Sequence, residues 1–180
     1  MNLSLNFSIR PYHLADQDKL VTVINTICAE GKWTYTNQFR PTPAWRHALE
    51  TPGCPCHLLL IVHDQEQAVI GWCDLFPDDT ASKATLGIGL LAAYRNQGIG
   101  TMLLQYALAR ARKQKLYKIR LVVNAENLRA IHLYEKFGFQ ANGIVVPPVP
   151  ADGTWMEMAT NSLNLILCNR KNLWLPPKQA

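Results

Sequence analysis

The segment that most constrains this chain is a hexapeptide near its middle, Arg95-Asn96-Gln97-Gly98-Ile99-Gly100. A strand-like run over residues 84–91 precedes it, and a helical pattern from Thr101 to about residue 115 follows it. The main chain at Gly98 and Gly100 can approach a ligand closely because no Cβ stands in the way. The first N–H groups of the helix lack partners within it, and the helix dipole adds positive charge there. We therefore expect an anion, most of all a pyrophosphate, at this turn.

This short motif leaves a plainer interpretation open, because a glycine pair before a helix also occurs as a simple strand-to-helix turn. The hexapeptide is not the dinucleotide-binding fingerprint, which needs a third glycine and an acidic residue about 20 positions further on. It also lacks the Gly-Lys-Ser/Thr ending of a P-loop.

A second informative segment lies downstream. Residues 118–123 are rich in β-branched side chains and predict a short buried strand. A turn over residues 124–127 leads into a helical pattern that ends at Gly138, a residue that often terminates helices. Four apolar side chains share one side of that helix: Ala130, Ile131, Leu133 and Tyr134.

Together the two segments resemble the GNAT superfamily of N-acetyltransferases. The pyrophosphate loop of that family, Arg/Gln-x-x-Gly-x-Gly/Ala, is matched by Arg95, Gly98 and Gly100. Its later segment is matched by Asn127, Ala130, Tyr134, Lys136, Gly138 and Phe139. The resemblance covers about residues 84–140. It implies an acetyl-CoA-dependent enzyme that acetylates a primary amine by direct attack in a ternary complex.

The resemblance also implies how acetyl-CoA is held. In this fold class the cofactor lies in a splay between two central parallel strands, here those that end near Leu91 and Val123. Backbone groups left unpaired by the splay need partners, which the pantetheine arm supplies. Asn127 would bond that arm or act only as a helix cap, and both roles stay open. The predicted cofactor-binding residues are Leu90, Leu91, Arg95, Asn96, Gln97, Gly98, Ile99, Gly100, Thr101, Asn127 and Tyr134.

Acetyl transfer needs an acid for the departing thiolate and, for a charged amine, a base. By match to the family, Tyr134 is the candidate acid; its alternative role is that of a core aromatic. Many relatives carry a glutamate on the strand before the glycine loop, whereas residues 85–90 contain none. Asp74 and Glu30 are the candidate bases, unless each is an ordinary surface carboxylate or a water chain serves. A missing base favours an amine of low pKa, because an α-amine of pKa about 8 is far more often neutral than a lysine amine of about 10.4.

The acceptor pocket is expected to be aromatic, since ligand pockets are mostly apolar. Trp33 and Tyr35 are its predicted walls, and the acceptor is a small-molecule amine or a peptide N-terminus. A non-catalytic acyl-CoA-binding or regulatory module is the alternative function. A homodimer is also possible. The net charge of +5 permits a weaker nucleic-acid-binding interpretation, but we expect no nucleic-acid partner because aromatic residues do not interleave with the basic run near the end of the long helix.

Composition bounds the remaining possibilities. A chain of 180 residues with 48% hydrophobic and 17% charged residues predicts one globular domain over residues 1–180, with a cofactor core at about 84–140. No apolar run approaches the roughly 20 residues of a membrane helix, and no signal peptide is evident, so a cytoplasmic location is expected. The five cysteines are predicted to be free thiols. No metal site is predicted, because the histidines show no metal-ligand spacing.

Periodicity along the chain predicts the element order β-α-α-β-β-β-α-β-α-β-β. This is an α/β fold with a mixed sheet and helices on both faces. Asp16 and Thr42 are predicted to cap the first two helices. A further strand-like alternation occurs at residues 163–167.

Overall fold

A computed structural model describes residues 7–78, 82–145 and 154–160. The order of its helices and strands is the predicted one, with two short 3₁₀ turns added, η1 (Leu14–Asp16) and η2 (Ala92–Tyr94). The main elements are β1 (Phe7–Pro11), α1 (Gln17–Ala29), α2 (Pro43–Glu50), β2 (Leu58–Asp64), β3 (Val69–Pro77), β4 (Lys83–Leu90), α3 (Ile99–Lys113), β5 (Lys118–Asn124), α4 (Leu128–Lys136), β6 (Gln140–Val145) and β7 (Trp155–Thr160). The alternation predicted at residues 163–167 lies outside the described residues.

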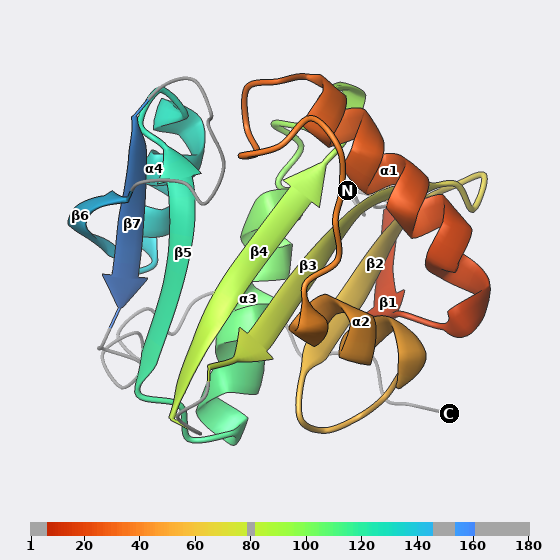
Figure 1. Cartoon of the computed structure of the whole chain (residues 1–180), viewed down its shortest axis with the longest axis horizontal. Coiled ribbons are helices and arrows are strands. Elements are labelled where there is room, and N and C mark those ends of the chain that lie inside the picture. Colours follow the sequence, from red (N-terminus) through yellow and green to blue (C-terminus); the bar gives the residue numbers. More distant parts are fainter. Residues whose placement is uncertain (1–6, 79–81, 146–153, 161–180) are drawn as a thin grey trace, which may run out of the picture.

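The strands form one seven-stranded mixed sheet in the order β1-β2-β3-β4-β5-β7-β6. Neighbouring strands are antiparallel except for the central pair, β4 and β5, which is parallel. Helices α1 and α2 cover one face of the sheet and α3 lies behind the other (Figure 1). Within the described part of the chain, no helix has both the length and the apolar character needed to cross a bilayer.

Each face of the sheet has its own hydrophobic core, and each core follows from helical spacing. On the α1 face, the buried side chains Leu20, Val23, Ile24 and Ile27 recur every three or four residues. On the opposite face, α3 buries Leu103, Leu104, Ala107 and Leu108 in the same way. Tyr134 of α4 belongs to this second core, so α3 and α4 share one side of the sheet.

The predicted start of α2 is confirmed, and Asp16 occupies the N-cap position of α1 as predicted, although only Thr42 caps its helix through a side-chain hydrogen bond. The Thr42 hydroxyl accepts a hydrogen bond from the Trp45 amide at 3.3 Å, and Pro43 occupies the first helical position. Asp16 does precede α1, but its side chain makes no capping bond to that helix. Its carboxylate instead accepts two hydrogen bonds from the Arg10 guanidinium, each of 2.7 Å. The nearby guanidinium lowers the pKa of Asp16.

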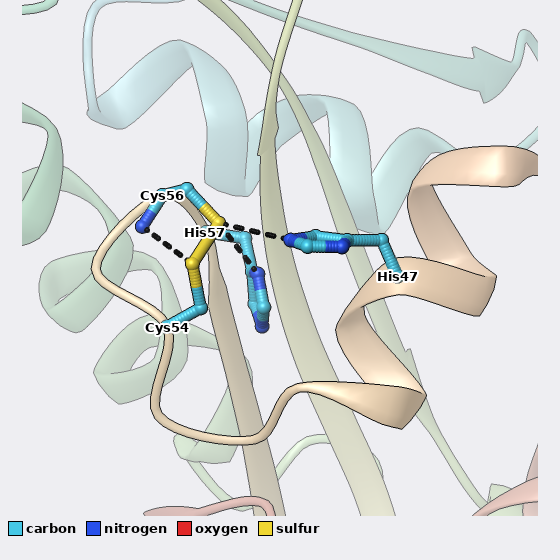
Figure 2. A group of neighbouring side chains, drawn as sticks. All are labelled: His47, Cys54, Cys56 and His57. Atoms are coloured by element: carbon cyan, nitrogen blue, oxygen red, sulfur yellow. Dashed lines mark hydrogen bonds between the residues drawn. A yellow bond between two sulfur atoms is a disulfide. The ribbon is translucent and has the colours of Figure 1, made fainter.

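The expectation of free thiols is wrong for two cysteines. Cys54 and Cys56 are joined in a disulfide in the loop between α2 and β2 (Figure 2). The turn at Pro55 brings their Cα atoms to 5.3 Å, which is within the range that disulfides require. Sequence spacing did not indicate this pairing, because one intervening residue fits no common disulfide or zinc pattern. Cys28 and Cys73 are free, as predicted, and both are buried. Cys168 lies outside the described residues.

Candidate active site

The parallel strands β4 and β5 pair over a short stretch only. Their register includes three residue pairs at the beginning of the strands: Lys83 with Lys118, Ala84 with Ile119, and Thr85 with Arg120. Beyond these pairs the two strands diverge (Figure 1), while β4 continues to Leu90 and β5 to Asn124. The facing backbone edges therefore lack their mutual ladder bonds, and such groups need other partners. This divergence is the predicted splay.

The glycine turn after β4 is open at its surface. Gly98 has a φ of 82° and precedes α3, which begins at Ile99, two residues earlier than predicted. Among the residues that the structure describes, a Cβ placed on Gly98 would meet nothing within 4 Å, and one on Gly100 would meet only the Leu133 side chain at 3.4 Å. The first bond within the helix runs from the Met102 amide to the Gly98 carbonyl at 3.2 Å. The three amides before Met102 are thus the orphan donors of a helix start, and they suit a diphosphate group.

Arg95 ties this turn to the end of α1. Its guanidinium bonds both carboxylate oxygens of Glu30, one of them at 2.8 Å, and its Nε donates to the Leu90 carbonyl at 2.9 Å. The Leu91 amide donates to the Ile70 carbonyl at 3.0 Å. Two strand-end groups predicted to face the acyl chain therefore already have protein partners. The Glu30 carboxylate is engaged by Arg95, which makes it a poor match for the role of base.

Two glycines of β4 leave room for the side chains of Asp74 and Trp72 on β3. It lies on β3 opposite Gly87 of β4, and Trp72 lies opposite Gly89. A Cβ on Gly87 would lie 2.3 Å from an Asp74 oxygen, and one on Gly89 would lie 2.2 Å from the indole of Trp72. The Trp72 Nε1–H donates to Asp74 Oδ1 at 2.9 Å. The side chains of Asp74 and Trp72 therefore lie over these two glycines of β4. A larger residue at either glycine would collide with them.

The environment of Asp74 and Tyr134 changes the acidity of both groups. Burial raises the pKa of Asp74 to about 7, although the Trp72 hydrogen bond acts in the opposite direction. Burial also raises the pKa of Tyr134, and the charges of Cys73 and Asp74 add to this effect. Near neutral pH, Asp74 can take up or release a proton, while Tyr134 stays a neutral O–H donor.

The loop after α1 connects the two sides of the splay. Glu30 contacts Arg95 beyond β4. At the end of β5, the side-chain amide of Asn124 donates a hydrogen bond of 3.2 Å to the Lys32 carbonyl. Tyr35 packs edge-on against Trp155 of β7 with ring centroids 4.6 Å apart. Asn124, which is buried, was missed in the sequence. The available signal was a polar residue at the carboxyl end of a buried strand, where α/β sheets bind their ligands.

The remaining predicted residues lie around the same end of the sheet. Asn127 caps α4, since its side-chain oxygen accepts a bond from the Ala130 amide at 3.2 Å. Its amide nitrogen is a donor that this cap does not use. The Lys32 ammonium lies 4.9 Å from the centre of the Trp33 ring. Gln97 donates to the Ala93 carbonyl at 3.0 Å, which holds the turn before α3.

A splayed parallel strand pair beside a glycine turn at a helix start is the arrangement that the sequence resemblance implied for binding acetyl-CoA. Residues 24–139 match the sequence model of the acetyltransferase (GNAT) family, so the chain belongs to that family. Its members transfer an acetyl group from acetyl-CoA, and the resemblance noted in the sequence is confirmed. The chain is accordingly an acetyltransferase with acetyl-CoA as its donor.

Individual relatives agree with this assignment. An L-methionine sulfoximine/L-methionine sulfone acetyltransferase from Pseudomonas aeruginosa is 31% identical over 171 residues, with 89% of this chain and 96% of that protein covered. A protein of the same name from Pseudomonas paraeruginosa is 26% identical with the same coverage. The solved phosphinothricin acetyltransferase of Sinorhizobium meliloti, in complex with acetyl-CoA, superposes with a TM-score of 0.71 at 19% identity. That match covers 86% of this chain and 88% of the other, and it shows the shared fold.

Proposed function

We propose that this enzyme acetylates the α-amine of a small amino-acid-like molecule by direct attack on acetyl-CoA in a ternary complex. The observation that carries this proposal is Asp74, a buried carboxyl whose pKa is raised to about 7. A base of that pKa accepts a proton efficiently near neutral pH. It replaces the strand glutamate that is missing from β4.

Asp74 and Tyr134 carry out the two proton transfers of the reaction. Asp74 takes a proton from the attacking amine as the new C–N bond forms and the thioester C–S bond breaks. Tyr134 donates its proton to the sulfur of the leaving thiolate. Because the pKa of Tyr134 is raised, the phenol stays protonated and can donate when the thiolate leaves.

Acetyl-CoA is held by the splay and the glycine turn. The amides of Ile99, Gly100 and Thr101 begin α3 and would bind the diphosphate. The open surface at Gly98 leaves room for that group, and the side-chain amide of Asn127 would bond the pantetheine arm. Arg95 acts through Glu30 and Leu90, whose positions it fixes.

The class of acceptor follows from the pKa of its amine and from the compounds for which the relatives are named. An α-amine of pKa about 8 is readily deprotonated by a base of pKa about 7, whereas a lysine-type amine of about 10.4 is not. The relatives named for methionine sulfoximine and methionine sulfone act on amino acids with a polar tetrahedral sulfur. Trp33 and Tyr35, on the loop over the splay, would line the pocket for that side chain.

A panel of amines tests this assignment. Release of free CoA thiol is measured with methionine sulfone, methionine sulfoximine, phosphinothricin, spermidine and a peptide with a free N-terminus. We expect turnover to be fastest with the α-amino acids, and none with N-acetylmethionine sulfone, whose amine is blocked. Preference for spermidine or for the peptide would refute the proposed acceptor class. Tight acetyl-CoA binding without any turnover would favour the non-catalytic module.

Two further features belong to the same proposal. We place the reaction in the cytoplasm, where acetyl-CoA is available, and we expect a homodimer. Sedimentation equilibrium measures the assembly state directly, and a monomer at micromolar concentration would contradict the expected dimer.

A further inference from the structure

A compact group of sulfur and nitrogen atoms lies beside α2. His47 comes from that helix, Cys54 and Cys56 from the following loop, and His57 from the residue just before β2. One ligand atom of each residue lies within 4.8 Å of the others. Figure 2 shows both imidazole rings directed toward the sulfur of Cys56. A disulfide alone requires no such pair of histidines.

The distances fit a tetrahedral metal site. His47 Nε2 and His57 Nδ1 each lie 3.3 Å from Cys56 Sγ. In a tetrahedral zinc site with Zn–S of about 2.3 Å and Zn–N of about 2.0 Å, neighbouring ligand atoms are roughly 3.3–3.8 Å apart. Two thiolates and two imidazoles form a familiar donor set for structural zinc. The Cys-Pro-Cys spacing is one residue shorter than that of most zinc pairs.

We propose that the reduced chain binds one Zn²⁺ through His47, Cys54, Cys56 and His57, in a closed four-ligand site that secures α2 to the sheet. The disulfide is the oxidised form of this site. A dithiol reductant passes two electrons and two protons to the S–S bond, which breaks into two thiols as the dithiol becomes a disulfide. Zinc then displaces both thiol protons and binds the two thiolates.

The surroundings favour this metal-bound form. Arg110 of α3 and Gln114, the residue after that helix, donate to the Pro55 carbonyl at 2.8 and 2.6 Å, which fixes the turn between the two cysteines. The Arg110 guanidinium places a positive charge against that loop, and positive charge stabilises thiolates. Within the described ranges its Nε is buried without a hydrogen-bond partner. A nearby thiolate would provide the missing acceptor.

One of the two histidines is also held in place by packing against the sheet. The ring of His57 contacts Phe76 of β3 with centroids 6.1 Å apart, which restricts its orientation.

The position of the site gives the metal a structural role. Trp45, on the same helix as His47, packs edge-on against Trp72 and Phe76. Trp72 in turn donates the hydrogen bond to Asp74. A metal that holds α2 against the sheet therefore supports the aromatic side chains around Asp74. All four ligands come from the protein, so the site has no open position for chemistry.

Metal titration of the full-length chain tests the proposal. The protein is reduced with a dithiol, freed of reductant without air, and titrated with Zn²⁺ against a chromophoric chelator. We expect one zinc per chain by elemental analysis, and a higher Tm than for the metal-free reduced chain. With Co²⁺ in place of Zn²⁺ we expect the strong visible bands of a tetrahedral ion together with a thiolate-to-cobalt charge-transfer band.

Matched variants make the outcome decisive. Cys56→Ser and His47→Gln should each abolish the 1:1 binding, whereas Cys28→Ala, which removes a buried thiol elsewhere, should retain it. Far-UV circular dichroism and acetyl-CoA binding verify that each variant is folded. Three results would each overturn the proposal. They are zinc binding no tighter in wild type than in Cys56→Ser, a cobalt spectrum without a charge-transfer band, and a disulfide that alkylation mass spectrometry shows to resist the dithiol.

Discussion

Replacement of Asp74 by asparagine should separate the role of its charge from the role of its shape. Asparagine has nearly the same size, so it fits above Gly87, and its oxygen can still accept the hydrogen bond from Trp72 Nε1. The variant loses only the ionisable group. We expect kcat to fall by about 10²–10⁴-fold, the range typical for removal of a general base, while acetyl-CoA affinity stays near that of wild type.

The same variant should change how stability depends on pH. Burial raises the pKa of Asp74 from 3.8 to about 7, so the neutral form is favoured in the folded chain. The resulting stabilisation is complete below about pH 4 and is lost as the pH rises to about 7. Each pH unit in this interval lowers the free energy of unfolding by about 1.4 kcal/mol, or about 4 kcal/mol in total. Asp74→Asn should lack this decline.

Two measurements check these expectations together. Urea unfolding from pH 4 to pH 8.5 gives the difference in free energy of unfolding between variant and wild type, which cancels the titration of shared groups. Wild-type kcat/KM should rise with an apparent pKa near 7, and the variant should retain only the titration of the amine. Asp18→Asn, which alters an exposed carboxylate on α1, is the control and should behave as wild type. A variant with wild-type kcat and a wild-type pH profile would refute the assignment.

Three further substitutions probe other parts of the site. Tyr134→Phe should lower kcat by about 100-fold with little change in the acetyl-CoA Kd. Steady-state kinetics and calorimetry measure the two quantities, and a raised Kd with unchanged kcat would show that Tyr134 only binds the cofactor. Gly87→Ala places a Cβ 2.3 Å from an Asp74 oxygen, so we expect about 1–3 kcal/mol of destabilisation and slower turnover; normal urea unfolding and activity would contradict the close contact. Gly100→Val should raise the acetyl-CoA Kd about tenfold or more, because added side-chain atoms at this helix start would hinder the approach of the diphosphate to the main-chain amides. Unchanged affinity in calorimetry would contradict diphosphate binding at this turn.

The sequence was sufficient for the element order because most segments carry a clear period. The buried positions of α1 and α3 recur at helical spacing, and β5 is a short run of β-branched residues. The glycine turn was visible for the same reason, since Gly98 and Gly100 stand directly before a periodic segment. Such local patterns are carried by neighbouring residues and do not depend on how the strands pair.

The relations across the sheet could not be predicted in this way. The place of Asp74 above Gly87 depends on the register between β3 and β4, which the two strand sequences do not specify on their own. Asn124 meets Lys32 across 92 positions of the chain. His47 meets Cys56 only because the loop after α2 folds back beside that helix (Figure 2). Each of these contacts depends on tertiary packing, so residue spacing alone carried no signal for them.

The central claim is that the splay between β4 and β5 presents acetyl-CoA to an amine beside Asp74. A crystal structure with CoA and methionine sulfone tests it most directly. We predict that the diphosphate contacts the amides of residues 99–101, and that the α-amine lies within hydrogen-bond reach of Asp74, directly or through one water. CoA bound away from the glycine turn, or an amine held by another carboxylate, would contradict the account.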